Sequence, residues 1–154
     1  MERLLTIPVS HNTSDACCTG VGGFANGEVW QRKLDNPVPS GYVNIQELIA
    51  AVEHVQHFCV KWSGCAVHLG VDNTQAVGWL NKGTARPPEA MPYIKQLFWL
   101  ALEHDFDLFV KYLPGVHNTI ADAASRFLQE ELDVAVRQWR EQYTVLSLGG
   151  HSDV

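Results

Sequence analysis

Four acidic residues stand where an α/β fold can bring them together. They are Asp15 in a polar strand segment, Glu47 in the first turn of an expected helix, Asp72 at the end of a buried apolar strand and Asp122 in the first turn of a later helix. Ligand sites in open α/β sheets lie beyond the carboxyl ends of the parallel strands, where Asp72 is expected. Clustered carboxylates bind hard cations such as Mg²⁺. Two such ions about 4 Å apart stabilise the attacking and leaving oxygens when water cuts a phosphodiester.

Each carboxylate also has an ordinary structural explanation. Asn44 and Glu47 stand three residues apart, as in a helix capping box. Asp72 can cap the helix that follows it, Asp122 can favour a helix dipole, and Asp15 can be a charge on a strand edge. If the four converge, however, each pair about 4 Å apart costs about 4 kcal/mol at an effective dielectric constant of 20. Such a cluster indicates function, because it does not add stability.

The apolar pattern along the chain predicts the elements that position these residues. The expected strands are 6–16, a hairpin over 20–33 that turns at Asn26-Gly27, 65–72 and 107–113. The expected helices begin at Asn44 as N-cap, at Asn73, at Pro87-Pro88 and at about Thr119. Three strands joined by tight turns are antiparallel, whereas strands separated by helices can pair in parallel. The order predicts a mixed five-stranded α/β sheet flanked by helices.

Composition bounds the class of protein. The chain has 154 residues, 46% of them hydrophobic, which predicts a single domain over 1–154 with a core at about 7–128 and an amphipathic helix and tail over 129–154. The sequence has neither a membrane-length apolar run nor a signal-peptide pattern, and its four cysteines lack zinc spacing. We therefore expect an intracellular protein without membrane contact. The net charge of −6 argues against a stand-alone nucleic-acid binder, although clustered carboxylates themselves lower the charge.

Several segments together resemble a known family. Asp15-Ala16 precedes a glycine-rich hairpin, and further segments follow in a fixed order: NIQEL at 44–48, VDNTQAV at 71–77, LNKG at 80–83 and LPGVHNTIADAASR at 113–126. Over residues 10–128 the chain resembles the ribonuclease H domains of retrotransposon reverse transcriptases, most closely those of DIRS-type (tyrosine-recombinase) elements. The combination of the last segment with Asp72-Asn73-Thr74 is specific, whereas any one segment alone is not.

The resemblance implies a fold, an activity and a cofactor. It implies a ribonuclease H-like fold and hydrolysis of the RNA strand of an RNA–DNA hybrid with two Mg²⁺ ions, which Mn²⁺ can replace. The implied metal ligands and catalytic residues are Asp15, Glu47, Asp72 and Asp122. The implied substrate contacts are Asn44 and Gln75, whose amides suit the 2′-hydroxyls that distinguish RNA. The implied partners are the hybrid and an upstream reverse transcriptase domain of the same polyprotein.

Two features depart from the family pattern. The family's histidine lies in a longer loop before the last helix, whereas His117 here lies five residues before Asp122; we keep it as a candidate catalytic helper. Asn118, counted with the substrate-binding residues, lies four residues before Asp122 and can orient that carboxylate. The basic helix of some members has no counterpart beyond Lys82 and Arg86, so an upstream domain is expected to strengthen binding.

Two alternatives stay open at this point. One is a catalytically inactive module of the same fold that binds nucleic acid or a protein partner, which the acidic charge favours and the complete carboxylate set disfavours. The other is an integrase, but integrases carry their third carboxylate on a late helix, whereas Glu47 precedes Asp72 here.

Other residues that attract attention have plainer explanations. His54 and His57 are expected on a solvated helix face, because spacing brings no third metal ligand near them. Phe98 and Trp99 are expected to pack in the core.

Overall fold

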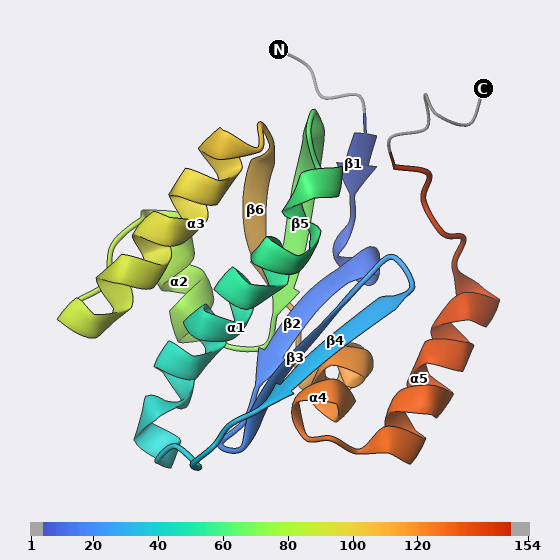
Figure 1. The fold of residues 1–154 in the computed structure, drawn as a ribbon, viewed down its shortest axis with the longest axis horizontal. Helices are drawn as coiled ribbons and strands as arrows, with labels where there is room; N and C mark the ends of the chain where they lie inside the picture. Colours follow the sequence, from blue (N-terminus) through green and yellow to red (C-terminus); the bar gives the residue numbers. More distant parts are fainter. Residues whose placement is uncertain (1–4, 149–154) are drawn as a thin grey trace.

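The computed structural model describes residues 5–148, which form a six-stranded sheet with helices on both faces (Figure 1). The strands are β1 (Leu5–Ile7), β2 (Asn12–Ala16), β3 (Gly20–Ala25), β4 (Glu28–Lys33), β5 (Cys65–Val71) and β6 (Asp107–Tyr112). The helices are α1 (Val43–Phe58), α2 (Thr74–Lys82), α3 (Met91–Glu103), α4 (Thr119–Ser125) and α5 (Gln129–Gln142). None of the helices in this part of the chain is long and apolar enough to span a membrane.

The sheet combines an antiparallel half and a parallel half around β5. β2, β3 and β4 pair antiparallel in chain order, and the β3–β4 turn has Asn26 at φ 49° and Gly27 at φ 99°, as a type I′ hairpin requires. β5 pairs in parallel with β2 on one side and with β6 on the other. The predicted mixed α/β sheet is confirmed.

The sheet has one strand more than the sequence predicts. The segment 6–16, expected as one strand, is divided by a 3₁₀ turn at Val9–His11 that follows Pro8, a residue with no N–H to give to a sheet. Its first part, β1, pairs in parallel with Cys65–Val67 of β5, and its second part, β2, pairs with Gly70 and Val71. β1 and β2 therefore share one side of β5.

Helices pack on both faces of β3. A Cβ atom added at Gly23 would clash with His54 of α1, and one added at neighbouring Gly22 would clash with Ala124 of α4. Because successive residues of a strand face opposite sides, α1 and α4 cover opposite faces. The larger core lies under α1, α2 and α3, and a smaller one, built on Phe24 and Trp139, lies under α4 and α5. Residues 149–154, the end of the predicted tail, lie outside the described residues.

The prediction that His54 lies on a solvated face is wrong. His54 is fully buried; Trp30 Nε1 donates to its Nδ1 at 2.9 Å, so its Nε2 carries the proton and donates to Asn12 Oδ1. Burial, and next the charge of His57, lower the pKa of His54 to about 3. The residue is thus a neutral bridge between α1, β2 and β4.

The prediction that Phe98 and Trp99 pack in the core is also wrong. On α3 the buried side chains are Ile94 and Leu97, whereas Phe98 is 54% exposed and Trp99 69% exposed. The helix is apolar around more of its circumference than its packing uses. The apolar spacing alone therefore does not identify the buried face.

Candidate active site

Asp15 lies in the middle of the sheet. It belongs to β2, pairs with Gly22 of β3 and is only 5% exposed. All five residues of β2 are buried although four of them are polar, so the strand is polar in sequence but occupies a central position. A carboxylate at such a place loses most of its hydration.

Glycines in β3 bring α4 close to Asp15. A Cβ at Gly22 would lie 2.7 Å from Ala124 Cβ, and one at Gly20 would lie 2.3 Å from Ser125 O. Both distances are shorter than atoms tolerate, so only glycine lets α4 rest directly on the strand. This close approach places Ser125 Oγ 3.5 Å from Asp15 Oδ2 and carries Asp122 to the same place.

Glu47 is held inside α1 and is not part of a helix cap. The sequence predicts Asn44 as N-cap, but α1 already begins at Val43, so Asn44 is helical and the capping-box explanation of Glu47 fails. Glu47 is 2% exposed, and its Oε1 is buried without a hydrogen-bond partner. A buried carboxylate oxygen left unpaired is costly, which indicates a ligand or ion not present in the folded chain alone.

Asp72 directly follows β5, as predicted, and does not cap the next helix. The cap of α2 is Asn73, whose Oδ1 accepts from Ala76 N at 2.8 Å. The Asp72 carboxylate instead accepts from the backbone of Gly115 in the turn before α4, where an added Cβ would lie 2.8 Å from Asp72 Oδ2. This turn therefore needs glycine to fit against the carboxylate.

The four carboxyl groups converge at one end of the sheet. Besides burial, the charge of Asp122 raises the pKa of Asp15 and the charge of Asp15 raises the pKa of Glu47, whereas the Ala16 backbone N–H lowers both, so these groups lie near one another. The charge of Asp72 acts on Asp15 and Glu47, and the charge of Asp122 acts on Asp72. The fold thus brings together the four acidic residues that the sequence singled out.

Burial and mutual repulsion raise the pKa values of these groups. Burial, followed by the charge of Asp122, raises the pKa of Asp15 to about 7. Burial, followed by the charge of Asp15, raises the pKa of Glu47 to about 10. The pKa of Asp72 is raised for the same reasons, burial first and Asp122 second. At neutral pH the site without cations therefore retains protons that a bound cation would displace.

An arginine pairs with Asp122, one of the two partly exposed carboxylates. Arg126 Nε donates to Asp122 Oδ1 at 2.9 Å across one turn of helix, and both side chains are about half exposed. Within residues 5–148, no group of three His, Cys, Asp or Glu side chains is already arranged so that it could hold a metal ion. Asp122 would have to leave or share its arginine to become a ligand.

The donor set nevertheless fits a hard divalent cation. All four groups offer carboxylate oxygen, the ligand type of Mg²⁺ and Mn²⁺. The unpartnered Oε1 of Glu47 is an oxygen for which a cation would supply the missing partner. Carboxyl groups held this close together, with raised pKa values, match the chemistry of such a cation.

Three amides lie next to the carboxylates. Asn44 Nδ2 donates to Gln75 Oε1, and Asn44 Oδ1 accepts from Asn73 Nδ2 at 2.7 Å. The chain of amides joins the first turns of α1 and α2, beside Glu47 and Asp72. Gln75 is exposed and therefore open to a ligand.

His117 and Asn118 occupy different surroundings from those expected. His117 is exposed and lines a hollow with Gln138 and Trp139 of α5, and none of the four carboxylates lines that hollow. Asn118 is 2% exposed and donates from Nδ2 to Ser14 O at 3.2 Å. Its amide fastens α4 to β2, and its backbone C=O accepts from Asp122 N at 3.1 Å, so its contact with Asp122 is through the backbone.

Known proteins resemble this chain in structure. No family model and no curated protein matches the sequence. Among solved structures, ribonuclease H1 from the archaeon Halobacterium salinarum superposes with a TM-score of 0.57 at 16% identity, covering 82% of this chain and 98% of that one. The chain has the ribonuclease H fold.

Two further solved structures also resemble the chain. The N-terminal RNase H domain of a Mycobacterium tuberculosis protein matches with a TM-score of 0.53 at 13% identity, over 86% of this chain and 96% of that one. LC11-RNase H1, isolated from compost by a metagenomic approach, matches with a TM-score of 0.51 at 17% identity, over 80% of this chain and 95% of that one. At such identities the likeness concerns the backbone, and the chemistry must be argued from the residues above.

The structure adds residues to the site that the sequence did not single out. Arg126 pairs with Asp122, and Ser125 Oγ lies near Asp15. The i, i+4 spacing of Asp122 and Arg126 indicates such a pair in the sequence. The roles of Gly22 and Gly115 have no local signal, because each depends on an element distant in the chain.

Proposed function

We propose that this chain is a ribonuclease H that hydrolyses the RNA strand of an RNA–DNA hybrid with the help of two Mg²⁺ ions. The observation that carries the proposal is the convergence of Asp15, Glu47, Asp72 and Asp122 at one end of a ribonuclease H fold. Mn²⁺ is expected to replace Mg²⁺, because both favour oxygen ligands.

Each part of the site has a role in this proposal. The four carboxylates would hold the cations, which when bound supply a nucleophilic water and stabilise charge on the leaving oxygen. Asp15 and Glu47, fixed by burial and by Ala16 N–H, give the site its rigid side. Asp72 and Asp122 are more exposed and face the substrate side. Arg126 is within reach to balance charge when the cations are absent.

The amides and a basic hollow extend this site along α2. Asn44 and Gln75 suit the 2′-hydroxyls of the RNA strand, since an amide can both donate and accept. Gln75 also lines a hollow of about 670 Å³ with Trp79, Lys82 and Arg86, whose two cations suit backbone phosphates. The hybrid would therefore lie across the starts of α1 and α2.

Replacing Gln75 tests this path. Gln75→Ala is expected to weaken binding of an RNA–DNA hybrid by about tenfold, the effect of losing one or two hydrogen bonds. Fluorescence anisotropy with a labelled hybrid and Ca²⁺, which supports binding without cleavage, measures the change. The matched control is Gln129→Ala, an exposed amide on α5. If the wild type and Gln75→Ala bind the hybrid with equal affinity, Gln75 does not contact it.

The biological setting is part of the proposal. The segment 113–126 resembles retrotransposon ribonucleases H, which supports a role in reverse transcription beside an upstream reverse transcriptase domain. The net charge of −6 supports such a partner, because a domain with few cations needs help to hold a polyanion.

A cleavage assay tests the proposed activity. The chain is incubated with Mg²⁺ and an RNA–DNA hybrid labelled on the RNA strand, with double-stranded RNA and DNA of the same sequence as controls. Cleavage of the hybrid alone, lost on adding a chelator, is the expected result. No cleavage by the chain, alone or joined to its polymerase domain, would contradict the proposal.

A second candidate is an inactive module of the same fold. The Arg126–Asp122 ion pair favours it, because it occupies a carboxylate that the active enzyme needs. Calorimetric titration with Mn²⁺ separates the two, since an inactive module of this kind would take up no cation.

A further inference from the structure

A backbone N–H fixes the orientation of the Asn73 side chain. Asn73 is the N-cap of α2, and its Oδ1 accepts from Ala76 N at 2.8 Å. A backbone N–H can only donate, so the side-chain atom that faces it must be the oxygen. The Nδ2 group of Asn73 is therefore the end that faces α1, where it donates to Asn44 Oδ1 at 2.7 Å.

The same rule fixes the next two amides. Because Asn73 presents a donor, Asn44 must accept with its oxygen, which leaves Asn44 Nδ2 to donate to Gln75 Oε1. Gln75 is exposed, and within residues 5–148 its Nε2 has no hydrogen-bond partner. The free end of the Gln75 side chain is therefore an NH₂ group, which is a donor. We call Asn73, Asn44 and Gln75 the amide network.

The surroundings of Gln75 offer groups of the same kind. Gln75 lines the hollow of about 670 Å³ along α2 together with Lys82 and Arg86, whose side chains can only donate. A face with an amide NH₂ group and two cations suits a ligand that presents hydrogen-bond acceptors. In a nucleic acid strand these are the phosphate oxygens and, in RNA, the 2′-oxygens.

The amide network lies beside the site carboxylates. Asn73 directly follows Asp72, and Asn44 precedes Glu47 by about one turn of α1. The two residues that orient Gln75 are therefore attached to the same two elements, α1 and the end of β5, that hold these carboxylates. An acceptor atom bound by Gln75 has a position fixed relative to the proposed cleavage site.

We propose that Asn73 is a positioning residue, which sets through Asn44 which end of the Gln75 amide meets the substrate. Gln75 then donates from Nε2 to an acceptor oxygen of the nucleic acid, a 2′-oxygen or a phosphate oxygen. The identity of the substrate rests on the proposed function, whereas the orientation of the three amides does not.

Asn73→Asp is expected to reverse the amide network and to keep the helix cap. One carboxylate oxygen still accepts from Ala76 N, because Asp caps helices about as well as Asn does. The other oxygen can only accept, so Asn44 must turn its NH₂ group toward it and its oxygen toward Gln75. Gln75 then donates to Asn44 and presents its own oxygen to the substrate, where it repels an acceptor.

NMR of the protein without nucleic acid tests the network by itself. In ¹H–¹⁵N spectra the Gln75 side-chain signals are identified by their loss in Gln75→Ala. In the wild type these NH₂ protons face water and exchange with it rapidly, whereas in Asn73→Asp one of them is bound to Asn44 and exchange slows. Circular dichroism with thermal melting checks that the variant is folded. An unchanged exchange rate in a folded variant overturns the proposal.

Hybrid affinity tests the effect on recognition. In the anisotropy assay with Ca²⁺, Asn73→Asp is expected to raise the dissociation constant at least about tenfold. In a Gln75→Ala background the same change is expected to have a much smaller effect, because it acts through Gln75. Asn73→Ser keeps a neutral cap but cannot hold Asn44, so it gives a smaller loss that again requires Gln75. Equal factors in both backgrounds overturn the proposal.

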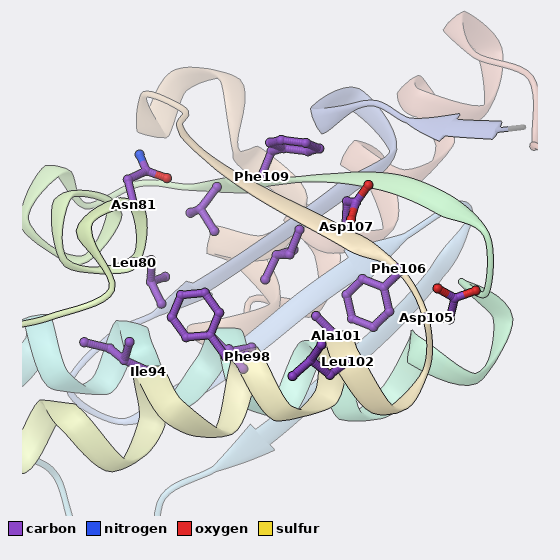
Figure 2. A pocket seen from close by; sticks show the side chains of 13 residues that line it. Leu80, Asn81, Ile94, Phe98, Ala101, Leu102, Asp105, Phe106, Asp107 and Phe109 are labelled. Carbon is purple, nitrogen blue, oxygen red and sulfur yellow. The ribbon is translucent and has the colours of Figure 1, made fainter. Parts of the chain in front are cut away.

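The matched control for the added charge is Asn81→Asp. Asn81 is exposed near the other end of α2, about 12 Å further along the helix, and borders a different hollow of about 380 Å³ between α2, α3 and β6 (Figure 2). No residue of the amide network lines that hollow. At this separation salt screens the charge, so hybrid affinity is expected to stay within about threefold of the wild type.

A DNA duplex of the same sequence distinguishes the two kinds of acceptor, because it has phosphates but no 2′-hydroxyls. A loss of affinity confined to the hybrid assigns the acceptor to a 2′-oxygen, and an equal loss with both assigns it to a phosphate. A loss with neither overturns the proposal. A wild type that binds no hybrid overturns the proposed function, whereas proton exchange at Gln75 still decides whether Asn73 orients the amides.

Discussion

Asp72→Asn is expected to lower the rate of hybrid cleavage at least about a thousandfold without disturbing the fold. Asp72 stands at the end of β5, where its carboxylate would help to hold the cations, and an amide has the same shape but no charge. Losing several kcal/mol of transition-state stabilisation corresponds to this factor. Single-turnover cleavage at saturating Mg²⁺ measures the rate, and circular dichroism with thermal melting checks the fold.

The control for this variant is Asp133→Asn. Asp133 is exposed on α5, where its carboxylate accepts from Gln129 Nε2 at 3.0 Å, so the same chemical change should leave cleavage unaltered. A rate for Asp72→Asn within tenfold of the wild type would show that this carboxylate is not a ligand of the catalytic ions.

Glu47→Gln is expected to stabilise the protein at pH 8 when no divalent cation is present. The unfolded chain releases this proton near the ordinary glutamate pKa of 4.5, whereas the folded chain holds it to about pH 10. Between these values the unfolded state binds fewer protons, so the free energy of unfolding of the wild type falls as pH rises. The proton of Asp15 lowers the free energy of unfolding in the same way as pH rises from 3.8 to about 7. Removing the Glu47 carboxyl group should raise the free energy of unfolding by on the order of 2 kcal/mol at pH 8 and change it little near pH 4.

Urea unfolding in EDTA at several pH values measures this difference. Glu131→Gln, an exposed carboxylate on α5, is the control and should follow the wild type throughout. Adding Mn²⁺ should stabilise the wild type at pH 8 but not Glu47→Gln, because a ligand stabilises only the state that binds it. A wild type whose stability rises between pH 4 and pH 8 in EDTA, with Glu47→Gln following it in parallel, would show that Glu47 is not held protonated.

Local patterns in the sequence were enough to predict the mixed sheet, except for the separate strand β1, and where the carboxylates stand along the chain. Asn26-Gly27 predicts the hairpin because both residues accept positive φ. The apolar run ending at Asp72 predicts a central strand with a carboxylate at its end, where the structure has it. These features depend on neighbours in sequence, which is why they can be read from it.

Features that depend on distant parts of the chain could not be predicted in this way. The 3₁₀ turn at Ser40–Tyr42 leads directly into α1 and makes Asn44 helical, so its amide is free to reach Gln75. His54 looks like a surface residue until Trp30 and Asn12 supply its hydrogen bonds. Tertiary packing decided the case of His54 against the local pattern, whereas the start of α1 is set by the turn that precedes it.

The most direct test of the central claim is a crystal of the protein soaked in Mn²⁺ and measured at a wavelength where manganese scatters anomalously. Two anomalous peaks about 4 Å apart, ligated by Asp15, Glu47, Asp72 and Asp122, are the expected result. With Asp122 bound to metal, Arg126 should have turned away from it. A crystal with no peak among these carboxylates, with the Arg126–Asp122 pair still intact, would contradict the proposed two-metal nuclease.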